Sequence, residues 1–244
     1  MASPLEQFTI KPIVSINIGG LNLSYTNSAL YMTIAVLVIV LGLVWLTSRR
    51  DMVPGRGQSF AESMYEFIAG LIRDNAGEEA MRYFPLIFSV FVFVAVGNVI
   101  GMIPGTFTYT SHIAVNFALA LFLFIVITGI GIARHGTHFF SLFLPEGTPG
   151  WLAPLMVPIE VIAYLSRPVS LAVRLFANMT AGHIIMKVFA GFVISLGGFF
   201  VLPGIFPFAL LFGLTGLEIF IAVLQAYIFT ILACVYLHDA IHLH

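Results

Sequence analysis

Residues 154–196 decide the fold: they form the long apolar stretch PLMVPIEVIAYLSRPVSLAVRLFANMTAGHIIMKVFAGFVISL, which contains no strong turn signal. A single helix of that length would be roughly 60 Å long, about twice the thickness of a bilayer's hydrocarbon core. Residues 206–238 form a second apolar stretch, and as a helix it would be roughly 50 Å long. Neither stretch fits an upright span, so each either breaks or tilts strongly. A strongly tilted pair, hinged between Gly197 and Pro207, agrees with both lengths.

The composition places the whole chain in a membrane. Of its 244 residues 60% are hydrophobic and only 9% are charged, with a mean hydropathy of +1.05. A soluble domain would carry about 25% charged residues. The net charge of −1 argues against a nucleic-acid partner, and the single cysteine, Cys234, excludes an internal disulfide.

Three shorter apolar stretches precede the long pair and predict further spans at 28–47, 83–103 and 112–133. The first ends at Arg49-Arg50 and the third at Arg134, so both ends are expected on the inner side of the membrane. Pro104 and Gly105 mark a short outer turn inside this hairpin. Residues 1–26 lack the features of a signal peptide and are expected to lie outside the bilayer.

Residues 57–75 differ from the spans because charges interrupt their apolar positions. Glu62, Glu66, Arg73 and Asp74 alternate with an apolar series at helical spacing: Phe60, Met64, Phe67, Ile68, Leu71 and Ile72. The pattern predicts an amphipathic helix along the inner membrane surface, or a cap helix on the soluble side.

Residues 135–150 are rich in Gly and Pro and predict a loop with a short apolar turn at 139–144. The chain is thus expected to be one all-α integral membrane domain, 1–244.

The two long stretches contain charges that a simple anchor would not need. These are Glu160, Arg167, Arg174, Lys187 and Glu218, accompanied by Asn178, His183 and Gln225. A charge inside a bilayer costs at least about 2.5–3.5 kcal/mol on insertion scales, so each is a functional hypothesis.

Helical spacing sorts these residues into faces. Glu160, Arg167, Arg174 and Asn178 fall on one face of their helix. Small side chains flank that face and would let another helix approach closely: Ser166, Ser170, Ala177 and Ala181. His183 points about half a turn away, whereas Glu218 and Gln225 share a face of the last helix.

The chemistry of these groups suggests two proton paths with a barrier between them. A guanidinium does not lose its proton in proteins, so Arg174 cannot relay protons but can attract a carboxylate. Glu160, His183 and Glu218 can each exchange a proton. A fixed positive charge between titratable groups is what two separated half-paths require.

Two motifs resemble the signatures of subunit a of the F-type ATP synthase. They are SRPVSLAVRLFANM at 166–179, followed by AGH at 181–183, and LQAYIF at 224–229. The resemblance implies that Arg174 is the essential arginine facing the carboxylates of a ring of c subunits, with Asn178 and Gln225 nearby. It also implies that Glu160 lines the inner half-channel, and that His183 and Glu218 form a pair in the outer one. Some bacterial members carry these two residue types in the reverse order.

The same resemblance implies a stationary proton-channel subunit that couples proton flow to ring rotation and ATP synthesis. Its expected partners are the c-ring, a peripheral stalk of subunit b or b/b′, the remaining ATP synthase subunits and membrane lipid. No cofactor or metal is expected, and the chain contains no GxxxxGK[ST] motif, so ATP chemistry is assigned to other subunits. The expected location is the bacterial inner membrane, with the mitochondrial inner membrane as the alternative.

Structural alternatives compete with several of these assignments. Arg174 could form a structural ion pair with Glu160 or Glu218. Arg167 could pair helices or snorkel beside Pro168, and Lys187 could be structural. Asn178 and Gln225 could bridge helices, whereas Asn98 and Asn116 could either line a path or bridge helices. His112 could belong to the outer access path. His238, Asp239, His242 and His244 include pairs whose spacing suits zinc, but the sequence favours a solvated C-terminal end.

Two other classes of function compete with the proton-channel subunit: a self-sufficient transporter and a structural anchor. No internal repeat of the kind found in transporters is visible in the sequence. The choice between protons and sodium ions stays open.

Overall fold

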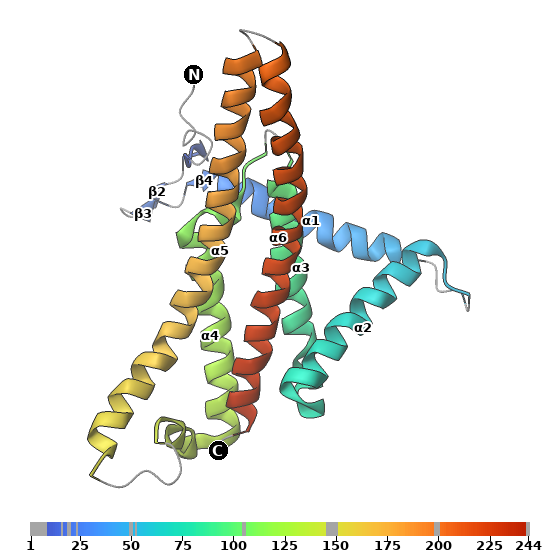
Figure 1. Ribbon diagram of the computed structural model, residues 1–244. Coiled ribbons are helices and arrows are strands. Elements are labelled where there is room, and N and C mark those ends of the chain that lie inside the picture. The colour runs from blue at the N-terminus through green and yellow to red at the C-terminus, as the bar shows by residue number, and fades with distance from the viewer. Residues whose placement is uncertain are drawn as a thin grey trace. The chain divides into compact units, whose positions relative to one another are not determined.

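The structure is a computed structural model that describes residues 9–15, 17–18, 21–22, 24–48, 51, 53–103, 106–144, 151–197 and 201–242. Within these ranges the chain is helical apart from a few short strands near its N-terminus (Figure 1). Five of the helical segments are long and apolar enough to cross a membrane. The chain is therefore an all-α, multi-pass membrane protein.

Short strands precede the first helix, a feature that the sequence did not predict. β1 (Pro12–Val14) pairs antiparallel with β4 (Tyr25–Thr26), and β2 (Asn17–Ile18) pairs with β3 (Leu21–Asn22). Asn27 closes this segment, because its side chain accepts from the Lys11 amide at 3.1 Å and donates to the Thr9 carbonyl at 3.1 Å. The strands therefore end where the first helix begins.

Helix α1 (Asn27–Leu46) is the first candidate span, one residue earlier at each end than the predicted 28–47. Its most apolar window is only 6% buried inside the protein, so its surface suits lipid. The predicted stop at Arg49-Arg50 lies outside the described residues.

Helix α2 (Arg56–Ala76) extends the predicted surface helix by one residue at each end. Its apolar face is buried only in the second half, at Ile68, Ala69, Leu71, Ile72 and Ala76. Phe60, near the start, is 61% exposed. Gly77 follows with a φ of +83°, a backbone conformation that favours glycine, and η2 (Glu78–Tyr83) leads into the next helix.

The predicted hairpin consists of α3 (Phe84–Gly101) and α4 (Ile113–His135), each slightly shifted from the predicted 83–103 and 112–133. The connection between them is longer than a simple turn. It includes η3 (Tyr109–Ser111), whose residues are all buried. Pro104 and Gly105, predicted to form the turn, lie outside the described residues.

A short helix and the long pair complete the chain. η4 (Gly136–Phe143) occupies the predicted apolar turn, and residues 145–150 are outside the described part. The long helices α5 (Ala153–Gly197) and α6 (Val201–Ile241) then follow. Each is continuous, although Pro158 and Pro168 lie inside α5 and Pro207 lies inside α6. Membrane helices tolerate internal proline.

The structure corrects the predicted bounds of the last helix. α6 begins at Val201, not at 206, and ends at Ile241, not at 238, so Pro207 is helical and is not part of a hinge. At 1.5 Å per residue α5 and α6 are about 67 and 61 Å long. Both helices are continuous, so the alternative of broken helices is wrong. Continuous helices of this length cannot stand upright within a hydrocarbon core of about 30 Å.

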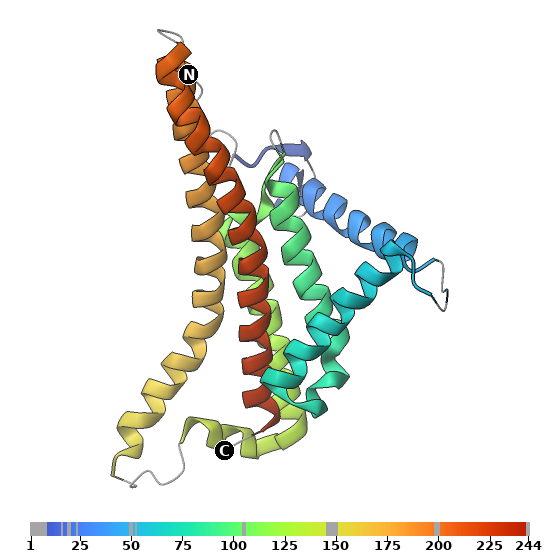
Figure 2. The same cartoon turned by 45° about the vertical axis from the view of Figure 1, so that its right-hand side comes forward.

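The chain divides into two compact units, and each is described by itself. The first contains Met1–Gly42, Val92–Ile113 and Leu175–Ala226. In it, the end of α5 and the start of α6 run side by side, as both views show (Figures 1 and 2). Its buried side chains include Tyr109, Leu175 and Met179.

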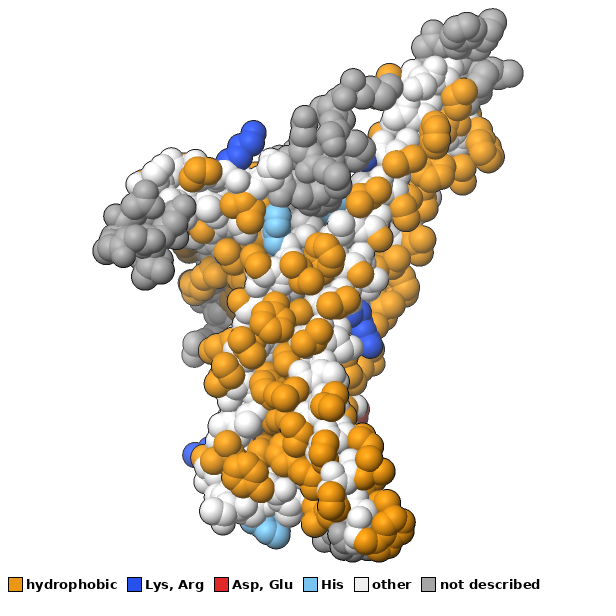
Figure 3. Space-filling view, turned by 90° about the vertical axis from the view of Figure 1, so that its left-hand side faces the viewer, with side chains coloured by type: hydrophobic (Ala, Val, Ile, Leu, Met, Phe, Trp, Pro, Cys, Tyr) orange, Lys and Arg blue, Asp and Glu red, His pale blue; other side chains and the backbone are white. Residues whose placement is uncertain are grey.

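The second unit contains Leu43–Phe91, Ala114–Arg174 and Tyr227–His244. Aromatic contacts join its helices, among them Phe67 with Phe91 and with Tyr227, each at a ring-centroid distance of 6.0 Å. Ile68, Ile72, Leu123, Phe229 and Leu237 are among its fully buried side chains. The face of the chain drawn in the space-filling view is dominated by hydrophobic side chains with isolated basic groups between them, as a lipid environment requires (Figure 3).

Candidate functional site

The first unit brings His183 of α5 and Glu218 of α6 together in its interior. His183 Nδ1 and Glu218 Oε1 are 3.9 Å apart, and the two residues are only 7% and 5% exposed. Within the described part of the chain, neither carboxylate oxygen of Glu218 has a hydrogen-bond donor. A buried carboxyl without donors is expensive to keep charged, so this group is suited to taking up and releasing a proton.

A glycine makes room for the carboxyl group. A Cβ atom added at Gly182 would lie 2.6 Å from Glu218 Oε1 and 2.8 Å from Cδ, closer than real Cβ atoms approach other atoms. Any larger side chain at this position would push the carboxyl group away. The AGH motif of residues 181–183 therefore has a local reason: the glycine admits Glu218 beside the histidine that follows it.

The resemblance to subunit a implies that this pair carries protons, so we expect Gly182→Ala to lower proton conduction by roughly tenfold or more, because displacing a reacting group by 1 Å has effects of that order. Gly191→Ala is the matched control on the same helix, since a Cβ atom there meets no described atom within 4 Å. Passive proton uptake by vesicles that contain the membrane sector measures both variants. Equal conduction by the two variants would contradict this account of Gly182.

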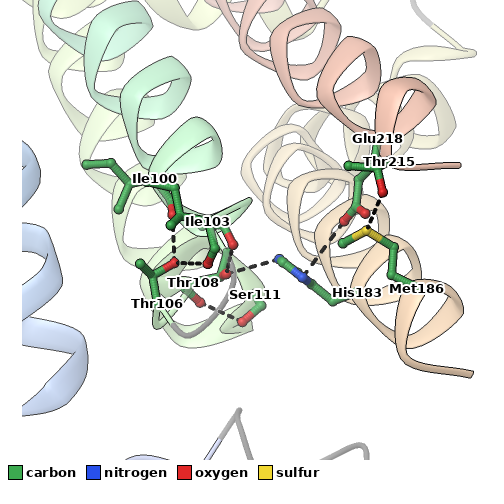
Figure 4. A network of polar contacts seen from close by, with 10 residues as sticks. Ile100, Ile103, Thr106, Thr108, Ser111, His183, Met186, Thr215 and Glu218 are labelled. Atoms are coloured by element: carbon green, nitrogen blue, oxygen red, sulfur yellow. Dashed lines mark hydrogen bonds and ion pairs between the residues drawn. The ribbon is translucent and has the colours of Figure 1, made fainter. Parts of the chain in front are cut away.

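The connection between α3 and α4 supplies a third member of the site. The Thr108 hydroxyl lies 3.0 Å from His183 Nε2 and donates to the Gly101 carbonyl at 3.0 Å. Figure 4 shows the imidazole between Thr108 on one side and Glu218 on the other. The sequence did not identify Thr108, because the burial of the four consecutive residues 108–111 is visible only in the structure.

His112 closes the same loop. Its ring stacks on Phe107 at a centroid distance of 5.0 Å, and burial lowers the pKa of His112 below its usual value. Its predicted place on an outer access path stays a prediction.

Asn178 and Gln225, both predicted to lie near Arg174, form a direct hydrogen bond with each other. Asn178 Nδ2 donates to Gln225 Oε1 at 2.7 Å, linking α5 to α6. One turn before Gln225, Asn98 Nδ2 donates to the Ala222 carbonyl at 3.0 Å and links α3 to α6. Asn98 therefore bridges α3 and α6, as one alternative predicted. Asn178 and Gln225 bridge α5 and α6.

Two hollows adjoin the buried pair. One, of about 340 Å³, is lined by His183, Lys187 and the end of α3. The other, of about 160 Å³, lies between α5 and α6 and is lined by Glu218 and Asn178. The histidine and the carboxyl group of one close pair thus open into different hollows.

Arg174 is exposed, and so are the small side chains at the neighbouring positions of α5. These are Ser166, Ser170, Ala177 and Ala181. Among the residues that the structure describes, no ion pair includes Arg174, and the alternative of a structural pair with Glu160 or Glu218 is not observed. Glu160, on the same helix in the second unit, is half-buried, and none of these ion pairs includes it.

Arg167 has a structural partner that the sequence did not identify. Its guanidinium forms an ion pair with Asp239 at 2.9 Å and lies over the rings of Tyr164 and Tyr236, at 5.1 and 4.8 Å from their centroids. Both residues of the pair belong to the second unit, where they join α5 to the end of α6. The prediction that Arg167 pairs helices is confirmed.

The C-terminal residues whose spacing suits zinc make other contacts in the structure. Asp239 is engaged by Arg167, and the rings of His238 and His242 stack at a centroid distance of 4.6 Å. His135 Nε2 contacts the Ile241 carbonyl at 2.9 Å, and His244 lies outside the described residues. Over the described ranges no group of three potential metal ligands occurs.

Comparison with known proteins covers nearly the whole chain. The ATP synthase A chain family matches residues 29–238. The chain is similar to ATP synthase subunit a of Paramagnetospirillum magneticum, with 56% identity over 247 residues and 100% of both chains covered. It is also similar to ATP synthase subunit a of Rhodospirillum rubrum, with 58% identity over 245 residues and 100% of both chains covered. The chain therefore belongs to the ATP synthase A chain family.

Proposed function

We propose that the chain is the stationary proton-channel subunit of the ATP synthase membrane sector. It provides two offset half-channels that load and unload protons on the carboxylates of a c-ring. Arg174 separates the half-channels, and proton flow through them turns the ring. The subunit is non-catalytic, because ATP is made in other subunits of the complex.

The observation that carries this proposal is that Arg174, a permanently charged residue, is exposed on a predominantly apolar helix and bordered by small side chains. A permanent charge exposed on a lipid-facing helix would be costly, so a partner of opposite charge has to cover it. Ser166, Ser170, Ala177 and Ala181 leave room for the backbone of an approaching helix. A ring helix with a carboxylate at this level meets both requirements.

The outer half-channel is assigned to the hollow beside His183 and the hollow beside Glu218. A proton enters past His183 and Glu218 and leaves the smaller hollow at Asn178, on the side of α5 that carries Arg174 by helical spacing. There it neutralises a ring carboxylate. The neutral site can rotate into lipid, where the ionised form would be costly.

The inner half-channel is assigned to the half-buried Glu160, which receives the proton after nearly a full turn of the ring. Arg174 then holds the carboxylate in its ionised form and blocks a direct leak, because it cannot release a proton. Each charge that crosses gains about 2.3 kcal/mol per 100 mV of membrane potential. That gain is the driving force for rotation.

The partners follow from the same role. They are the c-ring, a peripheral stalk of subunit b or b/b′, the remaining ATP synthase subunits and lipid. The relatives named above are bacterial, which supports a place in the bacterial inner membrane.

Proton flux that depends on the ring tests this function against that of a self-sufficient transporter. Vesicles containing the chain alone, the ring alone or both are given a membrane potential, and proton uptake is followed with a pH-sensitive dye. We expect uptake only when both are present, because each half-path ends at a ring carboxylate. Uptake by the chain alone would contradict the proposal.

A further inference from the structure

The hydroxyl of Thr108 lies between two buried groups that both need a hydrogen-bond partner. It is 3.0 Å from the Gly101 carbonyl and 3.0 Å from His183 Nε2, and Thr108 itself is 6% exposed. A hydroxyl has one proton to donate and lone pairs that accept. The direction of its two contacts therefore decides which nitrogen of His183 carries a proton.

The Thr108 hydroxyl donates its proton to the Gly101 carbonyl. Gly101 is the last residue of α3, and the last carbonyls of a helix have no N–H partner within the helix. Leaving such a buried carbonyl without a donor costs about 1–3 kcal/mol. With its proton directed to Gly101, Thr108 can only accept from His183, so the imidazole proton has to be on Nε2.

The loop around Thr108 is held so that the hydroxyl keeps this position. Ser111 Oγ donates to the Thr108 carbonyl at 2.6 Å, and Thr180 Oγ1 of α5 contacts the Ser111 carbonyl at 3.4 Å. A Cβ atom at Gly101 would lie 2.5 Å from Thr108 Cγ2, so glycine at that position permits the close approach. The Thr108 hydroxyl therefore joins Gly101, at the end of α3, to His183 of α5 within the first unit.

We propose that Thr108 is a positioning residue that fixes the tautomer of His183, so that the histidine exchanges protons with Glu218 through Nδ1 alone. Nδ1 is the nitrogen that faces Glu218 Oε1, at 3.9 Å (Figure 4). The proposal rests on the proposed function of the pair in the outer half-channel. In this proposal His183 accepts and releases protons at Nδ1 only and does not relay them from one ring nitrogen to the other.

The proton step is a simple exchange. When Glu218 is protonated, the bond between Oε1 and its proton breaks, a bond from Nδ1 to the proton forms, and a carboxylate and an imidazolium result. The return step reverses both changes. The separation of 3.9 Å exceeds a direct hydrogen bond, so a small side-chain movement or one bridging water completes the path. Beyond Thr108 the chain of hydrogen bonds ends at a backbone carbonyl, which cannot pass a proton on.

Three variants separate the hydroxyl from the shape of the side chain. Thr108→Val keeps the shape and removes the hydroxyl, and we expect passive proton conduction to fall about tenfold, as when an orienting partner of a histidine is lost. Thr108→Ser keeps the hydroxyl and should retain most of the conduction. The control is Thr33→Val, which removes a hydroxyl that donates to the Ala29 carbonyl on α1 at 2.8 Å and should leave conduction unchanged.

The tautomer itself is measured by ¹⁵N solid-state NMR on the reconstituted membrane sector with labelled histidine, at alkaline pH where the imidazole is neutral. His183→Gln identifies the signals of His183 by their loss. We expect a proton on Nε2 in the native chain and in Thr108→Ser, and a mixture of tautomers in Thr108→Val. A proton on Nδ1, or an unchanged tautomer in Thr108→Val, would overturn this inference. Neither result would touch the proposed function, which fails separately if flux does not require the ring.

Discussion

Replacing Arg174 with alanine is expected to lower ATP synthesis, driven by an imposed proton gradient, by at least about 100-fold. Alanine leaves the ring carboxylate without the charge that keeps it ionised at the interface, and such charge stabilisation is worth factors of about 10²–10³. The complex should still assemble, because Arg174 is exposed and forms no ion pair with any described residue. Arg174→Lys should recover only part of the rate, since an ammonium loses its proton more readily than a guanidinium.

The matched control is Arg73→Ala on α2. Arg73 forms an exposed ion pair with Glu78 at 3.2 Å, and exposed pairs contribute little to stability. We expect this variant to synthesise ATP at the native rate. Equal losses in the two variants would mean that any arginine supports assembly, and the special role of Arg174 would be abandoned.

Replacing Glu218 with glutamine is expected to lower passive proton conduction through the membrane sector by about 100-fold, the usual effect of removing a proton-transfer group. Glutamine has nearly the same shape but no exchangeable acidic proton. Packing against His183 and Gly182 should be preserved, so the loss reports chemistry and not folding. Glu218→Asp keeps the acid but withdraws it from His183 by one methylene, and we expect intermediate conduction.

Glu62→Gln is the control for this change. Glu62 is on α2, where it accepts a hydrogen bond from Gln58 at 2.8 Å, and the proposed paths do not include it. Its conduction should match that of the native complex. Native conduction in Glu218→Gln would show that protons bypass the buried pair, and the outer half-channel would have to be placed elsewhere.

The sequence predicted the helices well because their lengths and apolar composition are local properties. α1, α2, α3 and α4 begin and end within two residues of the predicted bounds. The polar residues inside the long helices were also visible, since each interrupts an apolar run. Their faces followed from helical spacing: Arg174 is exposed, whereas His183, about half a turn away, is buried.

Contacts between segments far apart in the chain could not be predicted in the same way. Thr108 meets His183 only because the loop after α3 folds inward, and no periodic pattern marks such a loop. Asp239 was assigned to a solvated C-terminus, but it pairs with Arg167, 72 residues earlier. The start of α6 was placed late because Pro207 signals a break in soluble helices, whereas membrane helices tolerate it.

The central claim is that Arg174 separates two proton paths at the ring, and ATP-driven acidification of inverted membrane vesicles tests it most directly. The native complex and Arg174→Ala are compared at equal amounts of assembled enzyme, with Arg73→Ala beside them. The account predicts acidification by the native complex and by Arg73→Ala, and none by Arg174→Ala. Undiminished acidification by assembled Arg174→Ala would contradict it.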